Sequence, residues 1–133
     1  EVIFGEAWYL LQQRRENSSP LKVVKLIKVK PGQKVIIPPG FGHVTINPLD
    51  KPLVMANWLA EDCQSNYEPY RRNHGAGYYI LTDKRIEPNP HYQNLPKLVT
   101  SNAKEYPQYG LITNQPMYYL INHLEKLDFL KSR

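Results

Sequence analysis

Cysteine is almost absent from this chain of 133 residues, which contains only Cys63. A single thiol excludes an internal disulfide and a metal cluster built from several cysteines, and it is typical of a reducing compartment. No stretch approaches the roughly 18 consecutive apolar residues that a membrane-spanning helix needs, and the start shows no secretory signal pattern. We therefore expect a cytoplasmic protein without a membrane partner.

The chain also lacks a concentrated excess of one charge. Seventeen Lys and Arg residues against 12 Asp and Glu residues give a formal net charge of +5. This balance suits an anionic small molecule, whereas a nucleic-acid binder usually carries a denser basic stripe. The basic residues between positions 14 and 34 are not accompanied by an aromatic stacking pattern, so we expect a solvated strand face and no nucleic-acid partner.

Twelve prolines, spread along the chain, exclude long helices over most of its length. Short apolar segments between turn residues predict an all-β fold. The expected strands cover residues 2–12, 21–30, 34–37, 43–47, 52–60 and 76–82. In the second of these, Val23, Ile27 and Val29 share one face, which Lys25 interrupts. With 41% hydrophobic residues, the chain has enough apolar material for one domain core.

The composition of the sequence changes after Ile86, where prolines break any regular element and the chain becomes polar and rich in tyrosine. We expect residues 87–133 to form a C-terminal extension packed on a barrel made by residues 1–86. After Asn114 and Pro116, apolar residues recur at near-helical spacing, which predicts one or two short helices at the end of the chain.

The most informative segment is residues 32–47. A strand ends at the turn Pro38-Pro39-Gly40, and the next strand begins at His43. Alternation places His43, Thr45 and Asn47 on one face and Val44 and Ile46 on the other. A single histidine at a strand end is most simply a hydrogen-bonded residue. A neutral imidazole is also the commonest protein ligand for a divalent metal, and a rigid turn would hold it well.

This segment resembles the second cupin motif, G(X)5PXG(X)2H(X)3N, and the positions that match are Gly32, Pro38, Gly40, His43 and Asn47. Cupins are small double-sheet β-barrels of the jelly-roll type that hold a metal in the lumen. The resemblance implies a cupin barrel in which His43 is the last metal ligand.

Residues 5–12 and 38–47, together with Trp58 and Tyr67, are similar to the cupin-type glucose-6-phosphate isomerases of archaea and some bacteria. The similarity covers roughly residues 1–82, and the remainder resembles the extension of the longer members. It implies a metal-dependent enzyme that interconverts glucose 6-phosphate and fructose 6-phosphate. It also implies a divalent iron, manganese, nickel or zinc ion, substrate contacts at Trp58 and Tyr67, and a homodimer.

The remaining metal ligands of the family are not found in this sequence. Gly5 matches the final glycine of the first cupin motif, so its glutamate ligand would lie about two residues before Glu1, and its His-x-His pair further upstream. We therefore expect residues 1–133 to be part of a longer chain and to be inactive alone, and no catalytic residue is assigned.

Two alternatives stay open. One is a metal-free cupin that binds a sugar or serves as a structural oligomer module. The other is a cupin enzyme of different chemistry: a mannose-type isomerase, an epimerase or a dioxygenase.

Overall fold

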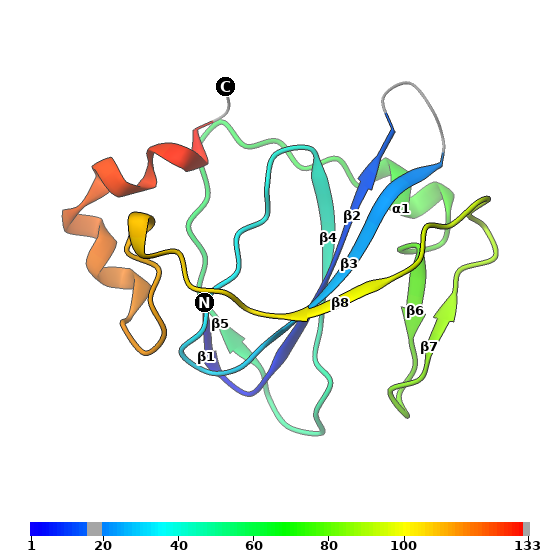
Figure 1. Cartoon of the computed structure of the whole chain (residues 1–133), viewed down its shortest axis with the longest axis horizontal. Helices are drawn as coiled ribbons and strands as arrows, with labels where there is room; N and C mark the ends of the chain where they lie inside the picture. The colour runs from blue at the N-terminus through cyan, green and yellow to red at the C-terminus, as the bar shows by residue number, and fades with distance from the viewer. Residues whose placement is uncertain (16–19, 132–133) are drawn as a thin grey trace.

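The computed structural model describes residues 1–15 and 20–131. Its main layer is a four-stranded sheet in the order β4 (Phe41–Ile46), β2 (Ala7–Arg14), β3 (Leu21–Val29) and β8 (Val99–Asn102), seen at the centre of Figure 1. The β4, β2 and β3 neighbours are antiparallel, whereas β8 runs parallel to β3. Because the side chains of β2 alternate between the two faces, this central strand contributes to two separate cores.

The inner face of the main sheet is covered by a second, smaller layer. There β1 (Val2–Phe4) pairs with β5 (Val54–Met55), and its backbone also bonds to the turn after β3. In that turn, Gly32 N donates to Val2 O at 2.8 Å, and Val2 N donates to Gln33 O at 3.1 Å. The buried residues between the layers are Val2, Ala7, Tyr9, Leu11 and Val29. The predicted all-β, cupin-like double-sheet fold is confirmed.

The segment that follows β5 packs on the outer face of the main sheet. The segment contains α1 (Glu68–Arg72) and the antiparallel pair β6 (Tyr78–Ile80) and β7 (Ile86–Pro88). Its buried residues Ala76 and Tyr92 pack with the outer side chains of β2 and β3. A buried amide joins the two, since Gln12 accepts from Gly77 N at 2.8 Å and donates to Tyr92 Oη at 3.1 Å.

The chain closes with three short 3₁₀ helices, η1 (Pro107–Tyr109), η2 (Met117–Asn122) and η3 (Leu124–Leu130). Leu111, Met117 and Leu120 form a third small core there. None of the helices in the described parts of the chain is long and apolar enough to cross a membrane. The predicted division at residues 86 and 87 stays a prediction, although this boundary falls inside β7.

Several predicted strands are wrong in extent. The segment 2–12 is broken at Gly5, whose φ is +82° and where a Cβ would lie 2.6 Å from Pro52 O. Residues 34–37 form no strand, because they join none of the sheets in the described parts of the chain. Their side chains do alternate, since Val35 and Ile37 pack in the inner core and Ile36 in the third. The segment 52–60 contributes only Val54–Met55, and β8 arises within a stretch that its sequence marks as irregular.

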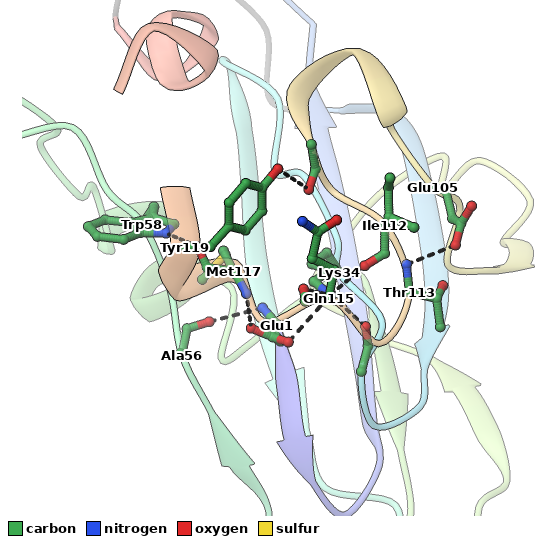
Figure 2. Close-up of polar contacts among 12 residues, drawn as sticks. Glu1, Lys34, Ala56, Trp58, Glu105, Ile112, Thr113, Gln115, Met117 and Tyr119 are labelled. Atoms are coloured by element: carbon green, nitrogen blue, oxygen red, sulfur yellow. Dashed lines mark hydrogen bonds and ion pairs between the residues drawn. The ribbon is translucent and has the colours of Figure 1, made fainter. Parts of the chain in front are cut away.

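A buried lysine joins the second layer to the C-terminal segment, as Figure 2 shows. The Lys34 side chain is 3% exposed, and its Nζ lies 3.3 Å from Glu1 Oε1. The same ammonium donates hydrogen bonds of 2.7 Å to the backbone oxygens of Gly32, Ile112 and Gln115. The second carboxylate oxygen of Glu1 accepts from Met117 N at 2.8 Å. We call these contacts the Lys34 clamp.

Replacement of Lys34 by methionine tests the clamp, because it keeps the length of the side chain and removes its charge. It leaves the Glu1 carboxylate without its cation and three carbonyl oxygens without their shared donor. We expect the free energy of unfolding to fall by about 3 kcal/mol, as for other broken buried ion pairs. Urea denaturation measures this, with Lys30→Met as the exposed control. Equal midpoints for the two variants would contradict a stabilising clamp.

Candidate functional site

The register of β4 with β2 decides where His43 lies. His43 pairs with Leu11, and Thr45 pairs with Tyr9. Residues opposite each other in adjacent strands share a face, so both side chains lie on the inner face of the sheet. Val44 and Ile46 pack instead with the outer core. The predicted alternation from His43 to Ile46 is therefore confirmed, and His43 lies on the inner face of the main sheet.

Asn47, the last residue of the matched motif, has a local role. It follows the end of β4, where its Nδ2 donates to Lys51 O at 2.7 Å and its Oδ1 accepts from Leu49 N at 3.1 Å. These bonds close the turn before Pro52. The motif asparagine therefore stabilises the turn that follows the histidine strand.

The His43 imidazole is exposed along one side and lies beside the Tyr9 ring, with the ring centroids 6.3 Å apart and the planes inclined by 39°. Partial burial lowers the pKa of His43 below its usual value of 6.5, because the charged form loses solvation. The imidazole is therefore neutral at pH 7, and the neutral form is the one that binds metals.

Tyr9 is the residue beside His43 that the sequence analysis missed. Its side chain is 7% exposed, and its hydroxyl donates to Met55 Sδ at 3.0 Å, across the space between the two layers. Burial raises the pKa of Tyr9 above 10, so the phenol stays protonated and acts as a donor. Its position follows from the pairing of β2 with β4, which joins segments about thirty residues apart and leaves no local sequence signal.

The two predicted substrate residues lie on other elements. Trp58 is half-buried against the third core, and its Nε1 donates to Met117 O at 3.2 Å. Tyr67 is 63% exposed and immediately precedes α1, where its backbone oxygen accepts from Tyr70 N at 3.0 Å. Their role in substrate binding stays a prediction.

A pocket of about 620 Å³ opens between β1 and the C-terminal segment. Its lining includes Val2, Ile3, Gly32, Trp58, Pro116 and Met117. Most of the described lining is apolar, and its polar side chains include Glu1, Asn57 and Asn114 but no basic residue for a phosphate. His43 is not part of its lining.

A divalent metal needs more ligands than these residues bring together. Over residues 1–15 and 20–131, no three His, Cys, Asp or Glu side chains converge in a way that could hold an ion. The Glu1 carboxylate is engaged by Lys34 and Met117. His74 and His91 contact each other, with ring centroids 4.4 Å apart. His43 is the candidate ligand that the matched motif places on the inner face.

The comparisons with known proteins agree with this geometry. A family model described as Glucose-6-phosphate isomerase (GPI) matches residues 1–97, a range that contains β1 to β7 and ends before β8. Neither the curated proteins nor the solved structures gave a match.

A pH titration followed by NMR tests the environment of His43. We expect its imidazole to titrate below pH 6.5, with the resonance assigned by its loss in His43→Gln. Because the unfolded chain has the higher pKa, of about 6.5, it binds the proton first as the pH falls. The stability that His43 contributes is therefore present above about pH 6.5 and is lost as the pH falls toward the folded pKa. A pKa of 6.5 or higher would contradict a partly buried ring.

Proposed function

Since the chain belongs to the glucose-6-phosphate isomerase family, we propose that it is the second-motif part of a cupin-type enzyme that interconverts glucose 6-phosphate and fructose 6-phosphate. The observation that carries the proposal is the family match over residues 1–97, which includes β4 with His43 and the strands β1, β2, β3 and β5. The position of His43 on the inner face supports it, because cupins hold their metal in the lumen between the sheets.

The reaction moves one hydrogen between C1 and C2 of an open-chain sugar, without net oxidation. The neutral imidazole of His43 suits one coordination position of a divalent iron, manganese, nickel or zinc ion. Such an ion would polarise the oxygens on C1 and C2 when bound. The count back from Gly5 places the other expected ligands before Glu1, so residues 1–133 would need that segment to form the complete site.

The described residues contribute mainly a rigid frame for His43. The β2–β4 pairing fixes the backbone of the histidine, and the Tyr9 ring limits the space beside the imidazole. The exposed Thr45 hydroxyl lies on the same face, one pleat further along β4. A polyhydroxylated ligand placed over His43 would therefore meet polar groups on a surface whose backbone is held by the sheet. Trp58, whose N–H is already bonded to Met117 O, would contact a sugar only through its ring.

A metal-free binding module is the second candidate. The observation that favours it is that no three metal-ligating side chains converge in the described parts of the chain. The two candidates differ in what a chelator does: it abolishes turnover by a metal-dependent isomerase and leaves sugar binding by a metal-free module unchanged.

The proposal predicts chelator-sensitive isomerisation by a polypeptide that joins the first cupin motif to residues 1–133. Conversion of fructose 6-phosphate to glucose 6-phosphate is measured by a coupled assay, and residues 1–133 alone are expected to be inactive. Loss of a residue that only orients a metal ligand lowers metal affinity or activity about 10–100-fold. Because His43 is proposed to be a ligand itself, we expect His43→Gln to lower metal affinity and activity by more than that. His123→Gln, which changes an exposed histidine before η3, is the control. Full metal content in His43→Gln, or turnover that a chelator does not affect, would contradict the proposal.

A further inference from the structure

The Tyr9 hydroxyl is a buried donor whose acceptor is unusually weak. A buried tyrosine hydroxyl normally bonds to oxygen or nitrogen, because loss of its bond to water is costly. The Tyr9 hydroxyl donates instead to the thioether of Met55 at 3.0 Å. Sulfur in a thioether is a poor acceptor. The bond to Met55 therefore compensates only part of the free energy that the hydroxyl loses when burial removes its hydrogen bond to water. A ligand oxygen in the same place would be a better partner.

Two features make this hydroxyl reachable from the surface, although the Tyr9 ring is part of the inner core. Tyr9 lies directly opposite Thr45 and next to the His43 ring, and both of these neighbours are exposed on the inner face. Its acceptor, Met55, belongs to the two-residue strand β5 and is itself exposed. Methionine side chains change rotamer easily. Rotation of Met55 would therefore free the hydroxyl without moving either sheet.

We infer that the Tyr9 hydroxyl donates a hydrogen bond to an oxygen of the bound sugar and exchanges Met55 Sδ for that oxygen. This inference rests on the proposed function and extends it by assigning a binding residue on β2. The ligand class is a polyhydroxylated open-chain sugar phosphate that lies over His43 and Thr45. The bond exists both before and during the reaction, so it lowers KM and leaves kcat largely unchanged.

Tyr70 provides a matched control on the opposite face. Its hydroxyl is also buried and has no hydrogen-bond partner among the residues that the structure describes. It lies against Gly42, where an added Cβ would be 2.5 Å from Tyr70 Oη, and its ring packs with the outer core. The substitution Tyr70→Phe thus removes a buried hydroxyl near the same strand without touching the inner face.

The test uses the polypeptide that carries both cupin motifs, as wild type, Tyr9→Phe and Tyr70→Phe. Three quantities are measured: metal content, kinetics with fructose 6-phosphate, and the Kd of glucitol 6-phosphate by calorimetry. Glucitol 6-phosphate has no carbonyl group and cannot react. For Tyr9→Phe we expect KM and Kd to rise about 3–10-fold, as for loss of one neutral hydrogen bond, with kcat and metal content unchanged. For Tyr70→Phe we expect wild-type values throughout.

Unchanged KM and Kd in Tyr9→Phe would overturn the inference, as would equal losses in Tyr70→Phe. A fall in metal content in Tyr9→Phe would also overturn it, because the hydroxyl would then act on the metal site or the fold. These results leave the proposed isomerase intact. A wild-type protein that neither isomerises fructose 6-phosphate nor binds glucitol 6-phosphate would instead reject the proposed function, and the role of Tyr9 with it.

Discussion

A lysine ammonium that is removed from water needs acceptors for its three protons, and Lys34 takes them from segments that are distant in sequence. Carbonyl oxygens of the turn at Gly32 and of residues 112 and 115 surround it, with the Glu1 carboxylate at 3.3 Å. Lys34 Nζ thereby joins three segments: the start of the first strand, the turn that begins the cupin motif, and the C-terminal segment. The glycine at position 32 fits this arrangement, since its φ is +80° and a Cβ there would meet the Asn114 side chain. The extension is thus bonded directly to the motif that carries the candidate site.

The two faces of β2 differ in role: side chains on the outer face pack in a core, and those on the inner face lie beside the candidate site. On the outer face, Trp8, Leu10 and Gln12 are covered by the segment around β6 and β7, and the buried Gln12 amide is satisfied by Gly77 and Tyr92. The inner face contains the same kind of apolar floor at Leu11 but also Tyr9, with the exposed His43 and Thr45 on the neighbouring strand. On the inner face the Tyr9 hydroxyl has only a weak acceptor, and the exposed His43 and Thr45 lie beside it, where a ligand can reach them.

The sequence was informative wherever structure depends on neighbours within a few residues. Alternation from His43 to Ile46 placed each side chain on its correct face, and the strand at residues 21–30 lies within one residue of β3. The errors concern partners distant in sequence. Residues 34–37 have the alternating apolar side chains of a strand but join no sheet in the described parts of the chain, whereas β8 pairs in parallel with β3 despite its irregular sequence. Tyr9 was missed for the same reason, since only the register of β2 with β4 brings it to His43.

Under the proposed function, His43 holds a metal on the inner face of the main sheet. The most direct measurement is a crystal structure of the metal-loaded polypeptide with both motifs, recorded at the absorption edge of its metal. The account predicts an anomalous peak about 2.0–2.2 Å from an imidazole nitrogen of His43, the usual distance for a histidine ligand. A metal bound elsewhere, with the His43 ring free, would contradict it.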